Sequence, residues 1–166
     1  VQYAELAGLR AYKLSAYSDA ERYYRQALEY LQEYLQKQLQ IPSEEQLHVA
    51  SLQEYLAECL RVLNRPEEAG QVYEQILTIY RQHQPTLSET SLYAQLQALL
   101  QFHMARARYN REEMEQTLQY CAQAEQILNS ATIPDGGAWA YTYLQQSYVY
   151  WRKGFFAQAS ILAQRA

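Results

Sequence analysis

The sequence has few residues that interrupt helices and no long apolar run. Its 166 residues include five glycines and four prolines, which is too few for the many tight turns of an all-β domain. No apolar stretch approaches the roughly 18 residues that a membrane-spanning helix needs. These absences favour a helical domain, and we expect no membrane partner.

Cysteine and positive charge are also scarce. Cys59 and Cys121 have no metal-binding or redox spacing, which is typical of proteins in a reducing compartment, so we expect a cytoplasmic location. Fourteen basic residues stand against 18 acidic ones, for a net charge of −4. Nucleic-acid-binding domains usually carry a basic face, so we expect no nucleic-acid partner.

Motifs that carry chemistry are absent, apart from one incomplete pattern. The sequence has no H-E-x-x-H, no Gly-rich phosphate loop and no G-x-S-x-G. Glu45 and His48 form an E-x-x-H, but a di-iron helical bundle needs two such motifs, and neither His83 nor His103 completes a second one. Cys59 follows His48 on the same expected helix by roughly 16 Å along the axis, too far for a catalytic pair. We predict no enzyme activity, no catalytic residue, no metal site and no cofactor.

Helix-forming residues dominate what is present. Gln, Glu, Ala, Leu and Arg are abundant, and 49% of residues are hydrophobic, enough to bury a core. Apolar side chains recur at helical spacing between the few breaks, and Ser18 with Glu21 has the spacing of a capping box. The pattern predicts eight helices in four hairpins, over residues 2–40, 43–83, 87–129 and 137–166.

Mostly small residues recur at fixed offsets in all four expected hairpins. One lies late in the first helix, the next follows after 12 residues, and the third after 7 more. The sets are Gly8, Ala20 and Ala27; Ala57, Ala69 and Ile76; Ala105, Thr117 and Ala124; and Ser147, Ala159 and Ala166. Such a recurrence indicates a structural repeat in which paired helices approach closely.

This spacing resembles that of the tetratricopeptide repeat, and the resemblance covers nearly the whole chain. It implies one all-α domain over residues 1–166, a right-handed superhelix of about four hairpins. The usual repeat has about 34 residues, whereas Ala20, Ala69, Thr117 and Ala159 follow one another at 49, 48 and 42. Extended repeats of this kind are similar to those of bacterial sensor and scaffold proteins. Arg108 occupies a position that is apolar in the family, which leaves a shifted register open for the third hairpin.

The resemblance also implies that the first helix of each hairpin lines a concave groove. In the last two hairpins these positions are rich in aromatic residues and arginine, the composition of binding hot spots. The expected groove residues are Phe102, Arg106, Tyr109, Asn110, Tyr141, Leu144, Tyr148, Trp151 and Arg152. The same residues could instead pack against hairpins outside this sequence. Glu5 and Leu9 replace the lysine and asparagine with which related repeats clamp chaperone tails, so a chaperone-tail receptor is not expected.

The sequence therefore predicts a protein- or peptide-binding module that catalyses no reaction. Because helical patterns run to both ends, we expect it to belong to a longer, bacterial chain, whose other domains could also be its partners. Two alternatives stay open. One is the ligand-sensing domain of a signal-transduction ATPase or transcription regulator, and the other is a structural spacer or self-association scaffold.

Overall fold

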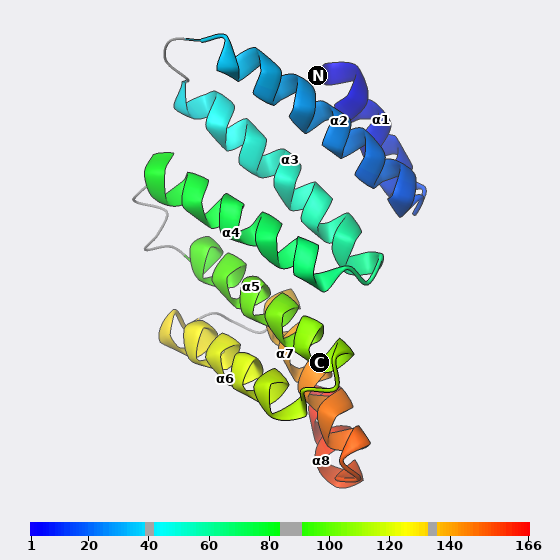
Figure 1. Cartoon of the computed structure of the whole chain (residues 1–166). Coiled ribbons are helices and arrows are strands. Elements are labelled where there is room, and N and C mark those ends of the chain that lie inside the picture. The colour runs from blue at the N-terminus through cyan, green and yellow to red at the C-terminus, as the bar shows by residue number, and fades with distance from the viewer. Residues whose placement is uncertain (39–41, 84–90, 133–135) are drawn as a thin grey trace. The chain divides into compact units, whose positions relative to one another are not determined.

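The computed structural model describes residues 1–38, 42–83, 91–132 and 136–166, which form eight α-helices (Figure 1). The helices are α1 (Gln2–Lys13), α2 (Tyr17–Gln36), α3 (Ser43–Val62), α4 (Pro66–His83), α5 (Ser91–Asn110), α6 (Met114–Ser130), α7 (Gly137–Arg152) and α8 (Phe156–Arg165). No strand occurs in these ranges, so the predicted all-α class is confirmed. Within the same ranges, no helix is both long and apolar enough to cross a membrane.

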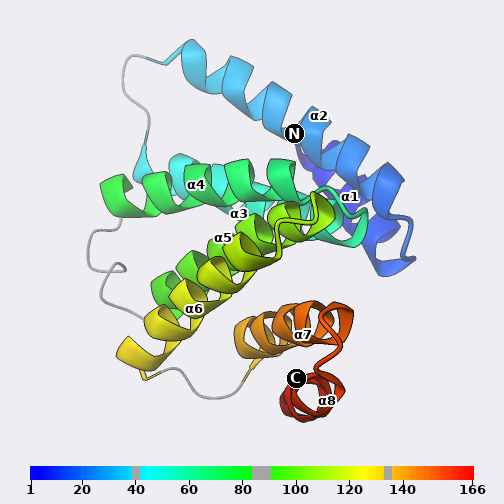
Figure 2. The same ribbon diagram turned by 60° about the horizontal axis from the view of Figure 1, so that its bottom comes forward.

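Consecutive helices pair along the chain, which divides into two compact units. Unit 1 is Val1–Pro85 and contains α1 to α4, and unit 2 is Thr86–Ala166 and contains α5 to α8. In unit 1, α1 packs on α2, α2 on α3, and α3 on α4. In unit 2, α5 packs on α6 and α7 on α8, and α7 also contacts both α5 and α6 (Figure 2).

All four hairpins turn through the same backbone conformation. Seven residues after the first member of each small-residue set, one residue has a left-handed φ: Ser15 at 58°, Asn64 at 56°, Glu112 at 64° and Gly154 at 82°. The backbone N–H of the following residue then donates to the carbonyl of the residue five positions earlier in the chain. These bonds join Ala16 to Ala11, Arg65 to Leu60, Glu113 to Arg108 and Phe155 to Tyr150, at 2.9 to 3.0 Å. This is the hydrogen bond of a Schellman helix end, and it occurs here at one repeated offset.

The third hairpin therefore has the same register as the other three. Glu112 adopts the left-handed conformation at the offset that the repeat requires, so no shift occurs there. Arg108 does not need an apolar environment, because its Nη1 donates to Glu113 Oε2 at 3.0 Å beside the turn. The register that the sequence left open is settled by the turn geometry.

The small residues lie where the paired helices meet. All members of the four sets are buried except Ala166. A Cβ added to Gly8 would lie 2.9 Å from Tyr24 Cε1 on α2. In the last hairpin, Ser147 Oγ donates to the Ala159 carbonyl at 2.9 Å. The recurrence in the sequence thus corresponds to close helix contacts.

The start of α2 differs from the prediction. The helix begins at Tyr17, before Ser18, and no side chain caps it. Glu21 does not complete a capping box, because its carboxylate accepts hydrogen bonds from Arg65 at 2.7 Å and from Arg25 at 2.9 Å. An ion pair with the neighbouring hairpin has replaced the local cap.

Candidate functional site

Helices α5 and α7 carry all the residues predicted for the binding groove. The two helices pack directly against each other. Four of the residues lie in the last three turns of α5, and the other five lie on α7. Two arginines and four exposed or half-buried apolar and aromatic residues among them form what we call the aromatic–arginine face: Arg106, Tyr109, Leu144, Tyr148, Trp151 and Arg152.

Phe102 and Tyr141 join α5 to α7 by a ring contact. Their rings stack with centroids 5.2 Å apart and planes at 25°. Phe102 is only 9% exposed, so its ring is a packing contact between α5 and α7 and offers little surface to a ligand. The sequence could not show how deeply the neighbours of Phe102 bury its ring.

Arg106 lies against two tyrosine rings that also contact each other, with centroids 6.2 Å apart. Its guanidinium carbon lies 5.5 Å from the Tyr109 ring centroid and 5.7 Å from that of Tyr148. Its Nη1 also donates to Gln145 Oε1 on α7, at 3.4 Å. Cation–π contacts of this kind stabilise the guanidinium in one orientation. An oriented guanidinium loses less conformational entropy when it binds a carboxylate or carbonyl.

Arg152 places a second guanidinium beside the same ring. Its Cζ lies 5.7 Å from the Tyr109 centroid, and its Nη2 donates to Glu112 Oε1 at 3.0 Å. The hydrogen bond that Arg152 donates to Glu112 raises the pKa of the guanidinium. Both partners are solvent-exposed, and such pairs are readily exchanged. A ligand carboxylate could therefore replace Glu112.

An exposed apolar stripe runs along α7 next to the two arginines. Leu144 is 37% exposed, Tyr148 39% and Trp151 62%, and their spacing puts them on one helix face. Asn110 is exposed at the last position of α5. The face combines apolar contact area with two cations, so it could hold an apolar side chain next to a carboxylate or a backbone carbonyl.

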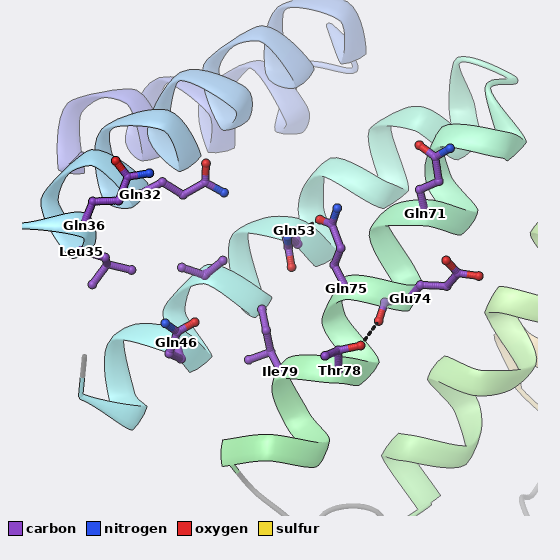
Figure 3. Close-up of a pocket in the computed structure, with 11 residues that line it drawn as sticks. Gln32, Leu35, Gln36, Gln46, Gln53, Gln71, Glu74, Gln75, Thr78 and Ile79 are labelled. Carbon is purple, nitrogen blue, oxygen red and sulfur yellow. Dashed lines mark hydrogen bonds between the residues drawn. The ribbon is translucent and has the colours of Figure 1, made fainter. Parts of the chain in front are cut away.

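Sequence reasoning missed a second candidate site in unit 1. Six glutamines from α2, α3 and α4 line a groove of about 760 Å³ (Figure 3). We call it the glutamine groove, and these residues are Gln32, Gln36, Gln46, Gln53, Gln71 and Gln75. A signal was present, because the glutamines are spaced by four residues on α2 and α4 and by seven on α3.

The residues that suggested chemistry have structural contacts. His48 Nε2 lies 2.7 Å from Glu5 Oε1 on α1, which joins the first two hairpins. Both cysteines are fully buried. Burial raises the pKa of the Cys59 thiol to about 11 and that of Cys121 to about 12. Thiols with such values stay protonated at neutral pH and are poor nucleophiles.

Comparison with known proteins identifies a shared fold but no family. No family model matches the chain, and no curated protein matches it. The structure is similar to the crystal structure of BtubC (BKLC) from P. vanneervenii, with a TM-score of 0.56 and 17% sequence identity. The match covers 99% of this chain and 59% of that one, so the chain spans less than two thirds of the length of that protein. At this identity the likeness concerns the fold alone.

Proposed function

We propose that the protein is a protein- or peptide-binding module that catalyses no reaction and acts in the bacterial cytoplasm. We further propose that its hairpins form a right-handed superhelix of the tetratricopeptide type. The four identical hairpin turns and the buried small residues at constant offsets support this architecture. The partner would be another protein, a peptide, or another domain of the same chain.

One observation carries the functional proposal: Arg106 lies against two neighbouring tyrosine rings beside an exposed apolar stripe. An apolar side chain of the partner would cover Leu144, Tyr148 and Trp151. A carboxylate or backbone carbonyl next to it would accept hydrogen bonds from Arg106 and Arg152. Tyrosine, tryptophan and arginine are the residues that contribute most often to binding hot spots, and here they share one face.

The test uses a library of random dodecapeptides displayed on phage and selected against the full chain. Selected peptides are synthesised, and their dissociation constants are measured by calorimetry. We expect Arg106→Ala and Tyr148→Ala each to weaken binding about tenfold or more, which corresponds to about 1.4 kcal/mol.

The matched control variants are Arg22→Ala and Tyr34→Ala, which remove the same residue types from exposed positions of α2. They should bind the peptides as the wild type does. Circular dichroism should show the same helix content in all four variants. The proposal fails if no selected peptide distinguishes the face variants from the controls.

Self-association is a second candidate, favoured by the surface of α8. Phe156 is 62% exposed and Ile161 is 52% exposed, and large apolar side chains in solvent are available for contact with a second copy of the chain. If the protein is such a scaffold, light scattering should give a wild-type mass that rises with protein concentration. The double variant Phe156→Ser, Ile161→Ser should have the mass of the monomer at every concentration. A monomeric wild type at all concentrations excludes it.

A further inference from the structure

The glutamine groove lies between α2 and α4, with α3 as its floor. Both outer helices pack against α3, and Figure 3 shows Gln32 and Gln36 of α2 on one side of α3 and Gln75 and Ile79 of α4 on the other. A second hollow of about 260 Å³ shares Gln32, Gln53, Gln71 and Gln75 with the first and continues along α3 to Leu60. From Gln46 to Leu60 the floor is roughly 21 Å long, at about 1.5 Å per helical residue. An extended chain of about six residues spans that length, at about 3.3 Å per residue.

The lining of the groove suits a neutral or cationic ligand with many amide groups. Each glutamine offers a carbonyl acceptor and an NH₂ donor, which are the groups of a peptide backbone. Leu35, Val49 and Ile79 add apolar surface between the amides. The larger hollow has one charged residue, Glu74, among its described lining residues, and the smaller one adds Glu29, Glu68 and the cation Arg25. Acidic side chains thus outnumber basic ones, so an anionic ligand would be disfavoured.

The side-chain oxygen of Gln53 lacks a hydrogen-bond donor among the described residues, which indicates that the ligand supplies one. The Gln53 side chain is only 5% exposed and lies between those of α2 and α4 (Figure 3). Its Nε2 donates to Gln75 Oε1 at 2.7 Å, which fixes the amide in place. Its Oε1 is buried and accepts no hydrogen bond. A buried acceptor without a donor is unfavourable, and a ligand N–H that reaches this oxygen would remove that cost.

We propose that the glutamine groove binds an extended, non-acidic polypeptide segment of about six residues. A backbone N–H of the segment donates to Gln53 Oε1. Its neighbouring backbone amides pair with Gln32 and Gln36 on one wall and with Gln71 on the other. This is a second binding site, in unit 1, and it shares no residue with the aromatic–arginine face of unit 2.

The probe is again the displayed dodecapeptide library, selected against the full chain carrying Arg106→Ala and Tyr148→Ala, so that the other site contributes little. Selected peptides are synthesised and titrated calorimetrically against the wild type and the groove variants. We expect Gln53→Leu, which keeps the side-chain size, to weaken binding about tenfold or more. The double variant Gln32→Ala, Gln36→Ala provides a second test in case Gln53→Leu impairs folding. It changes only exposed side chains and should also weaken binding about tenfold.

The control variant is Gln26→Ala, which removes an exposed glutamine of α2 outside the groove and should bind like the wild type. N-methylation of alternate backbone amides in the peptide should weaken binding about tenfold, because it removes the donors. An aspartate in the peptide should weaken it as well.

Three results would overturn the proposal. The first is binding of the selected peptides that neither groove variant weakens. The second is equal binding of the N-methylated peptides. The third is a different Gln53-dependent ligand: N-acetylglutamine amide, or a second copy of the chain, detected as a change of mass in Gln53→Leu. None of these results affects selection by the aromatic–arginine face, so the two proposals fail separately.

Discussion

Gly8 shows how tightly the first hairpin is packed. A Cβ at this position would lie 2.9 Å from Tyr24 Cε1 and 3.0 Å from Cδ1. The Tyr24 ring is 1% exposed and stacks on Tyr55 with centroids 5.3 Å apart, so it has little room to move. We expect Gly8→Ala to lower the free energy of unfolding by about 1–3 kcal/mol, measured by urea denaturation.

Replacing glycine by alanine within a helix normally stabilises it by about 1 kcal/mol. A loss of stability in Gly8→Ala would therefore indicate a steric clash with Tyr24. Gly137 provides the matched control, since a Cβ added there meets nothing within 4 Å. Gly137→Ala should therefore leave stability unchanged or raise it slightly. Equal effects of the two substitutions would show that Gly8 is not a close contact.

The two thiols should be protected in the folded protein. Both side chains are fully buried, and burial raises the pKa of Cys59 to about 11 and of Cys121 to about 12. At pH 8 we expect almost no reaction with a thiol-specific disulfide reagent until denaturant is added, when both react. Fast labelling of either cysteine in the native protein would contradict its buried position.

The same thiols give stability a definite dependence on pH. In the unfolded chain a cysteine ionises near its ordinary value of 9.0, whereas the folded protein keeps the proton to about pH 11. Above about pH 9 the folded state therefore binds more protons than the unfolded state, so stability falls as pH rises. Replacing Cys59 with alanine should reduce this slope, measured as the urea midpoint between pH 8 and 10.

The hairpin turn is the element that repeats most faithfully, and only Gly154 among its four left-handed residues suits that conformation without strain. Left-handed φ costs other L-residues roughly 1–2 kcal/mol, with asparagine penalised less. Ser15→Gly should thus raise the free energy of unfolding by about 1 kcal/mol, and Gly154→Ala should lower it by a similar amount. No neighbouring atom lies near a Cβ on Gly154, so the second effect reports the backbone alone.

Ser51 is the control for this prediction, because it is exposed within α3. There the same serine-to-glycine change should lower stability by about 0.5 kcal/mol. Thermal or urea unfolding of Ser15→Gly and Ser51→Gly should give shifts of opposite sign. Shifts of the same sign would contradict the left-handed conformation of Ser15.

The helices were predictable from the sequence to a greater extent than the sites. The helical spacing of apolar residues and the few breaks in it predicted where the helices lie. The small residues at fixed offsets predicted where paired helices touch. Both signals are local in the sequence. Burial depends on several helices at once, so Phe102 was expected in a groove although its ring is covered. Gln53 was overlooked for the same reason: on one helix it is an ordinary helix former, and only the convergence of three helices makes its amide a site.

At the scale of the whole molecule, the two candidate sites occupy different units and share no helix. The glutamine groove uses α2, α3 and α4, and the aromatic–arginine face uses α5 and α7. Sites without shared partners usually act additively. We expect Arg106→Ala to leave the dissociation constant of a groove-selected peptide within about twofold, and Gln53→Leu to leave that of a face-selected peptide equally unchanged. A peptide weakened by both variants would contradict this independence.

Two independent sites would allow one partner to bind through two short segments. If a groove-selected and a face-selected sequence are joined by a Gly-Ser linker, the second contact becomes intramolecular, with an effective concentration set by the linker. We expect affinity to exceed that of either peptide by about 10²–10⁴ at the best linker length and to fall as the linker is made longer or too short. Gln53→Leu or Arg106→Ala alone should abolish the gain, measured by calorimetry over a series of linkers. An affinity that never exceeds that of the tighter single peptide would mean that the sites cannot be occupied together, and the module would then hold its partner through one segment at a time.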